Sequence, residues 1–124
     1  MKLLDQIKDF ARGAAIIKDW LGGDGIVVHP QTAQKRADIC LACPKNVQGL
    51  VLTETVAKAI SEQLEIKNHL RLRVKGEKSL HHCEVCSCVN RLQIWCPSHF
   101  LTKYSTPAEL EKYPEACWKR HPEP

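Results

Sequence analysis

The sequence predicts a small α+β domain, and three observations lead to this prediction. The chain has 124 residues, of which 44% are apolar and 26% are charged, and these are ordinary values for one globular domain. Apolar residues recur at helical spacing in two long segments, near residues 3–21 and 53–75. Short β-branched runs and closely spaced cysteines lie between and after these segments, and they favour short strands and tight turns.

The first periodic segment predicts an amphipathic helix with a flexible end. Its apolar stripe has gaps of four, three, four, three and four residues and comprises Leu3, Ile7, Phe10, Ala14, Ile17 and Leu21. The glycines of "GGDG" at residues 22–25 then end the helix. We therefore divide the chain into an N-terminal arm at 1–25 and a cysteine-rich domain at 26–124. Because the stripe must be covered and its spacing suits a helix–helix seam, we expect the arm to mediate self-association or to dock on a protein partner.

Shorter elements follow the arm. Residues 26–28 ("IVV") are a strand candidate, and the next turn leads into a short helix that Thr32 could cap and that runs through Ala33, Ala37 and Cys40. The second periodic segment, at about 53–75, predicts one long helix or two short ones broken near residues 67–68 and ending at Gly76.

Two elements are predicted near the C-terminus. The run "RLQIW" at residues 91–95 alternates polar and apolar side chains, which is typical of a strand. A last helix has the start signal of an N-cap threonine, a proline and a capping-box glutamate, at Thr106, Pro107 and Glu109, and Pro114 stops it.

Two C-x-x-C pairs carry the chemistry of the sequence. Each pair can present both sulfurs from one tight turn, and two pairs complete the closed tetrahedral shell of a structural zinc site. We expect the zinc ligands to be Cys40, Cys43, Cys83 and Cys86. The 39 residues between the pairs contain the predicted helix at about 53–75, with connections long enough to bring the chain back. The predicted body is therefore a zinc ribbon with one or two inserted helices.

The sequence also offers alternative metal ligands and an alternative cofactor. Cys88 follows Cys86 closely enough to replace a ligand, and Cys117 could approach from the C-terminal segment. A C-x-C step and two Cys-Pro steps also occur around iron–sulfur clusters, so a cluster is the alternative to zinc. Pro44 lacks the N–H that often steadies a knuckle sulfur. The thiol of Cys96 is expected to be an ordinary buried one, and His81 and His82 are expected to be exposed rather than ligating.

The order of these cysteines resembles a group of small, largely uncharacterised cysteine-rich proteins of bacteria and their tailed phages. The resembling pattern runs from "ICLACP" through C-x-x-C-x-C to "CW". The resemblance implies metal binding and a virion or assembly setting, and it implies no enzymatic activity. Its cysteine positions would be Cys40, Cys43, Cys83, Cys86, Cys88 and Cys117. Ser87 departs from the pattern, which usually has glycine there.

Catalysis and membrane insertion are not expected from this sequence. An all-thiolate shell is closed, and no zinc-protease or deaminase signature occurs. The start of the chain meets Asp5 before an apolar stretch can develop, so we expect no signal or membrane segment and a reducing cytoplasmic location, or a virion assembled there.

Nucleic-acid binding by a zinc ribbon is the alternative to a structural or adaptor role. A basic run could follow a phosphate backbone through Lys67, Arg71, Arg73, Lys75 and Lys78. The run has no interleaved aromatic residues, and the net charge of the chain is only +4. The sequence therefore favours a solvated basic surface over a nucleic-acid site.

Overall fold

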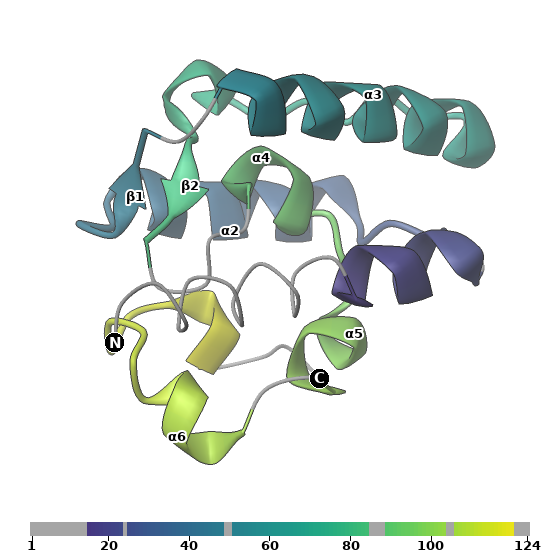
Figure 1. Ribbon diagram of the computed structural model, residues 1–124. Coiled ribbons are helices and arrows are strands. Elements are labelled where there is room, and N and C mark those ends of the chain that lie inside the picture. Colours follow the sequence, from purple (N-terminus) through teal and green to yellow (C-terminus); the bar gives the residue numbers. More distant parts are fainter. Residues whose placement is uncertain (1–14, 24, 49–50, 85–88, 104–105, 121–124) are drawn as a thin grey trace.

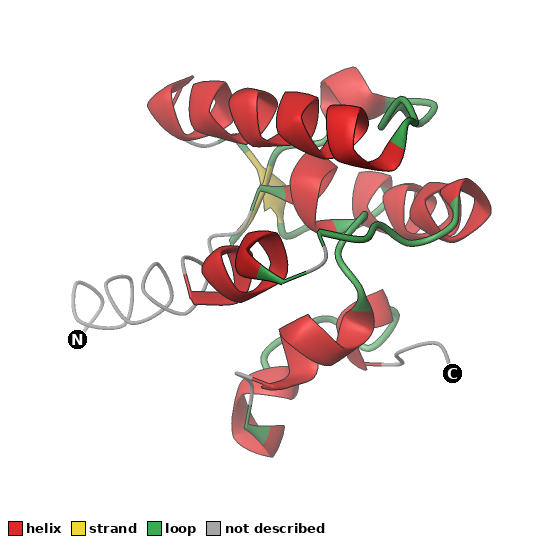
Figure 2. Cartoon of the chain, turned by 90° about the vertical axis from the view of Figure 1, so that its right-hand side faces the viewer, coloured by secondary structure: helices red, strands yellow, loops and turns green. Residues whose placement is uncertain are grey.

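A computed structural model describes residues 15–23, 25–48, 51–84, 89–103 and 106–120 of the chain. These residues form an α+β body of helices with one small antiparallel sheet, which lies at the left edge of the body in Figure 1 and is drawn in yellow in Figure 2. A helix over residues 15–22 comes first. The further elements are α2 (Pro30–Leu41), β1 (Asn46–Val47), α3 (Val51–Asn68), η1 (Glu77–Ser79), β2 (His82–Cys83), α4 (Asn90–Gln93), α5 (Ser98–Lys103), α6 (Pro107–Leu110) and η2 (Trp118–Arg120). No described helix is long and apolar enough to span a membrane.

The helices are stacked in layers around α4. In Figure 1, α3 lies across the top, α2 and α4 lie beneath it, and α5, α6 and the C-terminal turn lie at the bottom. The short helix α4 contacts both α2 and α3, and η2 contacts α5. The C-terminal segment thus packs against the body.

The helix through Ala33, Ala37 and Cys40 is confirmed, but it begins earlier than predicted. Pro30 occupies the first turn, where its missing N–H costs nothing and its fixed φ favours the helix. The cap is His29, whose Nδ1 accepts a hydrogen bond from the Gln31 N–H (3.1 Å), so the predicted cap at Thr32 is wrong. The start of the last helix agrees with the prediction, since α6 begins at Pro107.

The predicted break near residues 67–68 is confirmed, because α3 ends at Asn68. His69 follows with φ 51°, and the Leu70 N–H donates to the Glu65 carbonyl (3.2 Å), which is the pattern of a Schellman motif. The Asn68 side chain also donates to the carbonyls of Leu64 and Gly25, both at 2.9 Å. The Asn68 amide therefore fixes the helix end to the chain that leaves the first helix.

No second helix follows the break, so the predicted extension of the helical insertion to residue 75 is wrong. In this segment, backbone N–H groups donate to side chains instead of to helix carbonyls. The Leu72 N–H donates to Glu65 Oε2 and the Lys75 N–H donates to Gln34 Oε1, both at 2.8 Å. Leu72 itself is buried in the apolar core. These contacts therefore hold the segment against the body without a helix.

The sheet joins the chain that leaves α2 to the chain that returns from α3. β1 and β2 are antiparallel, with Asn46 opposite Cys83 and Val47 opposite His82. The Asn46 side chain strengthens this junction, since its Oδ1 accepts from the His81 N–H (2.7 Å) and its Nδ2 donates to the Ser79 carbonyl (2.8 Å). The prediction that the chain can return after the helical insertion is confirmed. A zinc-ribbon topology remains a prediction.

Two predicted strands are absent from the described residues. Residues 90–93 form α4, because the segment is buried on all sides rather than on alternate positions. Asn90, Leu92 and Gln93 are all buried, and Gln93 donates to Asn90 through its side chain. Residues 26–28 are not part of a strand, although the Val28 N–H donates to the Trp95 carbonyl (3.1 Å).

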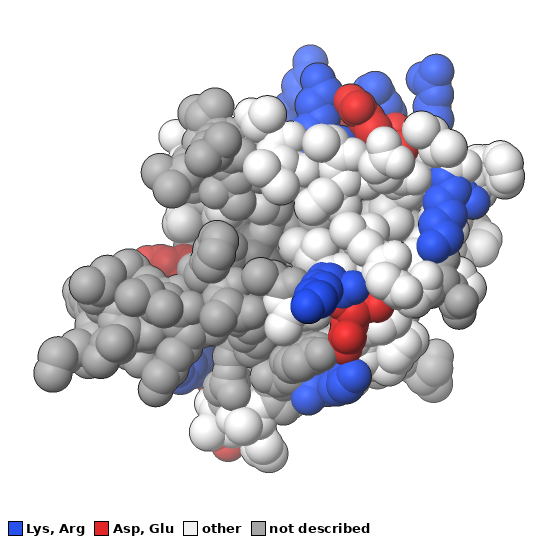
Figure 3. All heavy atoms as spheres, turned by 45° about the vertical axis from the view of Figure 1, so that its right-hand side comes forward, with Lys and Arg blue, Asp and Glu red and all other residues white. Residues whose placement is uncertain are grey.

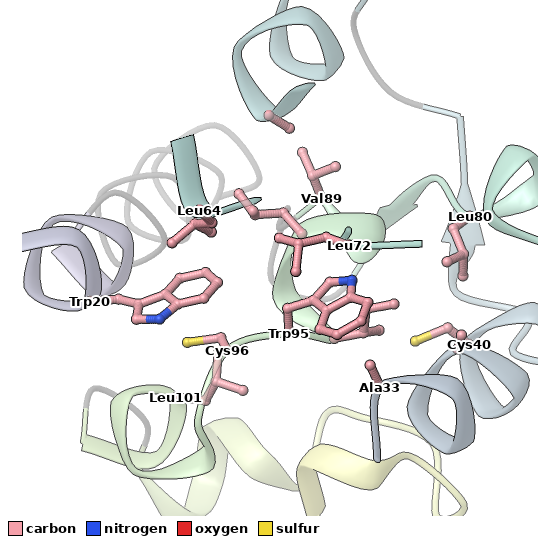
Figure 4. Packing of buried hydrophobic residues seen from close by; sticks show 14 of the residues in the cluster. Trp20, Ala33, Cys40, Leu64, Leu72, Leu80, Val89, Trp95, Cys96 and Leu101 are labelled. Carbon is pink, nitrogen blue, oxygen red and sulfur yellow. The ribbon is translucent and has the colours of Figure 1, made fainter. Parts of the chain in front are cut away.

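One apolar core runs through the described body. Figure 4 shows Trp20 and Leu64 at one side of it, Trp95 in the middle and Cys40 at the other side. Ile16 and Trp20 of the first helix are buried, and Ile17 and Leu21 pack against the core half-buried. Residues 3, 7, 10 and 14 of the predicted stripe lie outside the described residues, so self-association of the arm stays a prediction.

The burial of Trp20 leads to a stability prediction. Its ring is 1% exposed and its Nε1 donates to the Ile26 carbonyl (2.8 Å). Trp20→Ala leaves a cavity and an unpaired carbonyl, so we expect the free energy of unfolding to fall by about 3–5 kcal/mol in urea titrations. Val56→Ala, at a position that is 52% exposed, should change it by no more than about 0.5 kcal/mol. Equal effects of the two substitutions would contradict the described core.

Candidate metal centre

Four cysteine thiols from three separate segments line one small cavity. Cys40 lies at the C-terminal end of α2, Cys43 lies in the turn that follows, Cys83 lies on β2, and Cys117 immediately precedes η2. The cavity has a volume of about 10 Å³. This is about the room that one water molecule needs, so the space suits a single ion.

The turn from Cys40 to Cys43 places both cysteines in the lining of this cavity. It is closed by hydrogen bonds from the Cys43 N–H to the Cys40 carbonyl (3.1 Å) and from the Asn46 N–H to the Cys43 carbonyl (3.2 Å). The Lys45 N–H donates to Cys43 Sγ (3.4 Å). An N–H···S contact therefore exists in this turn although Pro44 cannot supply one.

The Cys40 thiol is buried and accepts a hydrogen bond. Its Sγ accepts a hydrogen bond from Trp118 Nε1 (3.3 Å), and the residue is 6% exposed. Burial raises the pKa of Cys40, the Trp118 hydrogen bond and the charge of Lys119 oppose that increase, and the nearby Cys117 and Cys43 add to it. These mutual influences identify Cys40, Cys43 and Cys117 as electrostatic neighbours.

Trp118 is held between the cluster and a buried arginine. The guanidinium carbon of Arg36 lies 4.3 Å from the centre of a Trp118 ring. Arg36 is 1% exposed and donates through Nη1 to the carbonyls of Ile94 (3.0 Å) and Cys96 (2.7 Å) and through Nη2 to Ser98 Oγ (2.8 Å). The arginine thus ties α2, the segment after α4 and the C-terminal turn together beside the thiols.

The structure brings most of the predicted ligands together and adds one from the open alternatives. Cys40, Cys43 and Cys83 share the cavity, and the fourth thiol described there is that of Cys117. Cys86 and Cys88 lie outside the described residues. His82 is buried and His81 is half-buried, contrary to the exposed positions expected for them, and neither lines the cavity.

The thiols surround the cavity without closing on a common point. Among the described residues, no three Cys, His, Asp or Glu side chains already have the arrangement of a metal site. Binding would have to draw the sulfurs to about 2.3 Å from the metal.

Three residues beside the thiols were not predicted from the sequence to belong to the site. Trp118 and Lys119 follow Cys117 directly, and Asn46 lies three residues after Cys43. Trp118 and Lys119 could have been recognised as site residues, because an indole and an ammonium group follow a cysteine directly in the sequence. The role of Asn46 had no such signal, because it depends on pairing with a strand that is distant in the sequence.

The residues proposed for nucleic-acid binding are exposed at the end of α3 and along the chain that follows. Lys67 Nζ donates to the Gly23 carbonyl (3.3 Å), and Arg73 Nη1 lies 3.5 Å from Glu77 Oε1. Lys and Arg side chains are interleaved with Asp and Glu on the face drawn in Figure 3. Lys67 and Arg73 therefore already have partners within the protein, and the drawn face has no continuous basic surface.

Comparisons with known proteins add no family assignment. No family model, no curated protein and no solved structure matches this chain. The interpretation of the thiol cluster therefore depends on its geometry and its chemistry.

Cys96 belongs to the apolar core rather than to the thiol cavity. It is 1% exposed, it is not among the residues that line the cavity, and its Sγ lies 3.6 Å from the Pro97 carbonyl. Burial raises the pKa of Cys96 to about 12, and the charge of Arg36 only partly opposes this effect. The group stays a neutral thiol at physiological pH.

This environment predicts an unreactive thiol that can be replaced by an apolar side chain. We expect iodoacetamide at pH 8 to leave Cys96 unmodified in the folded protein and to alkylate it in urea, as measured by peptide mass spectrometry. Cys96→Val should lower the free energy of unfolding by less than about 1.5 kcal/mol. Rapid alkylation of Cys96 in the folded state would contradict its assignment to the core.

Proposed function

We propose that the chain is a non-catalytic structural or adaptor protein in which one zinc ion fastens the C-terminal segment to the body. The proposed ligands are Cys40, Cys43, Cys83 and Cys117. The observation that carries the proposal is that these four cysteines, from three segments, line one ion-sized cavity.

The chemistry of the residues fits zinc. Thiolates are preferred ligands of structural zinc, and a closed shell of four sulfurs is a common arrangement. The N–H groups of Trp118 and Lys45 are hydrogen-bond donors to Cys40 Sγ and Cys43 Sγ, and such donors favour the thiolate form that a metal requires. When bound, zinc would supply cross-linking of these segments, because binding and folding are coupled in sites of this kind.

The size of the cavity favours a single ion over an iron–sulfur cluster. A cluster contains several metal and sulfide atoms and needs much more space than the cavity of about 10 Å³ provides. The four described thiols match the ligand number of one zinc ion. Zinc is therefore the proposed metal, and the cluster is the alternative that the experiment below separates from it.

A closed four-thiolate shell also supports a structural rather than a catalytic role. Catalytic zinc keeps one coordination position for water or substrate, and four protein sulfurs leave none. The resemblance to small cysteine-rich phage and bacterial proteins adds a virion or assembly setting to the proposal. Docking of the N-terminal helix on a protein partner is proposed for the same setting.

Metal analysis of cysteine variants tests the ligand set. Anaerobically purified protein should contain one zinc ion per chain, measured by elemental analysis. Cys117→Ala should lose this zinc and lower the thermal unfolding midpoint, because removal of one ligand weakens both metal binding and folding. Cys96→Val is the matched control and should retain the full amount of zinc.

Cys86→Ala distinguishes the two candidate fourth ligands. Retention of zinc by Cys86→Ala and loss by Cys117→Ala supports the described cavity. The reverse result would return the fourth position to Cys86, as the C-x-x-C pairs alone predict. Folded wild-type protein without metal, or protein containing iron and sulfide with visible absorption, would contradict the zinc proposal.

A further inference from the structure

The four cysteines that line the thiol cavity differ in their exposure to solvent. Cys40, Cys83 and Cys117 are each 6% exposed, whereas Cys43 is only half-buried. Cys43 lies in the turn after α2, between two exposed residues. Of these four cysteines, Cys43 is therefore the one that a small reagent in solution reaches first.

The same turn holds Cys43 close to Cys40. The Cys43 N–H donates to the Cys40 carbonyl (3.1 Å), which closes a turn with these two cysteines at its ends. Such a turn keeps the Cα atoms of its first and last residues less than about 7 Å apart, and disulfides join residues whose Cα atoms are about 4.4–6.8 Å apart. Because both residues also line one cavity, a disulfide can form within the turn without the approach of another segment.

The other two cysteines of the cavity are held by different parts of the fold. Cys83 lies on β2 and Cys117 precedes η2, and both belong to a buried cluster with Tyr113. Their positions relative to Cys43 depend on tertiary packing. Cys40 is the partner whose position relative to Cys43 is set by a local hydrogen bond.

We propose that Cys43 and Cys40 are a modification site, at which a hydroperoxide converts the two thiols into a reversible disulfide. Cys43 Sγ attacks one oxygen of hydrogen peroxide, the O–O bond breaks, and the Cys43 thiol becomes a sulfenic acid while its proton leaves with hydroxide as water. Cys40 Sγ then attacks Cys43 Sγ, the S–O bond breaks, and the Cys40 proton leaves with hydroxide as a second water. Two thiols are thus oxidised to one disulfide, and one peroxide is reduced to two water molecules.

The disulfide itself requires no metal, and only its effect on zinc rests on the proposed function. Oxidation removes two of the four proposed ligands, because a metal binds thiolates and not a disulfide. It also acts on Trp118, whose Nε1 donates to Cys40 Sγ (3.3 Å), since a disulfide sulfur is a weaker acceptor than a charged thiolate. The modification therefore releases zinc and loosens the attachment of the C-terminal segment.

Peptide mass spectrometry of the full-length, anaerobically purified protein tests the disulfide. Trypsin releases both cysteines in one peptide, residues 37–45, which follows Arg36 and ends at Lys45. After treatment with hydrogen peroxide and alkylation in urea, this peptide should lack two hydrogen atoms and carry no alkyl group. Dithiothreitol should restore both thiols. A chromophoric chelator in the same sample should detect zinc at the rate at which the disulfide forms.

Three variants separate the roles of the sulfurs. In Cys40→Val, no sulfur in the turn remains to displace hydroxide, so dimedone, which traps sulfenic acids, should label Cys43 at least about tenfold more than in the wild type. In Cys43→Val, Cys40 should stay unlabelled, because it is buried. Cys96→Val is the matched control and should form the disulfide within about twofold of the wild-type rate, because Cys96 does not line the cavity.

The outcomes distinguish this inference from the proposed function. A wild-type disulfide from Cys43 to Cys83 or Cys117, or oxidation of Cys43 to a sulfinic acid without any disulfide, overturns the inference even if zinc binds. Zinc that stays bound while the disulfide forms overturns the proposed release. Formation of the disulfide by protein that never contains metal supports the modification site and overturns only the zinc centre. If Cys40→Val does not fold, the wild-type peptide 37–45 decides.

Discussion

Two short strands, Asn46–Val47 and His82–Cys83, join the place where the chain leaves α2 to the place where it returns from α3. The pairing is only two residues long, and a sheet of this size has little stability of its own. The Asn46 side chain supports it with hydrogen bonds to the His81 N–H and the Ser79 carbonyl. Because Cys83 lies opposite Asn46, the pairing also sets the distance between two cysteine-bearing segments. The helix α3 can extend from this junction without separating them.

The C-terminal segment connects the thiol cavity to the apolar core. Cys117 faces the cavity, and the next residue, Trp118, is 3% exposed and belongs to the core cluster. Its indole donates to Cys40 Sγ on one side and contacts the Arg36 guanidinium on the other. If Cys117 is a metal ligand as proposed, a change of ligation there would act directly on core packing. This continuity explains why metal loss is expected to lower stability rather than only to loosen a terminus.

The features that depend on local sequence could be predicted, and those that depend on distant pairing could not. The apolar spacing of Ala33 and Ala37 and the phase slip at residues 67–68 gave α2 and the end of α3 correctly, because helices are stabilised by near neighbours. The alternation at residues 91–95 was misleading. Gln93 is a polar residue that is buried through a hydrogen bond to Asn90, and burial of this kind imitates the solvent-facing half of a strand.

The candidate site, like the fold, could be predicted from the sequence only where it depends on residues that are close in the chain. Three cysteines of the two C-x-x-C pairs, Cys40, Cys43 and Cys83, line one cavity, since the first two share a tight turn and the intervening chain returns. Their role as metal ligands stays a prediction. Spacing favoured Cys86 as the fourth ligand and left Cys117 as an alternative, because the approach of a residue from a separate segment depends on tertiary packing. The contacts of Trp118 with Cys40 and Arg36 provide that packing for Cys117.

Anomalous diffraction at the zinc absorption edge, from anaerobically grown crystals, would show whether a metal joins the C-terminal segment to the body. The proposed site predicts one anomalous peak per chain, at about 2.3 Å from the Sγ atoms of Cys40, Cys43, Cys83 and Cys117. A peak whose ligands do not include Cys117, or a well-ordered protein with no peak at these thiols, would contradict it.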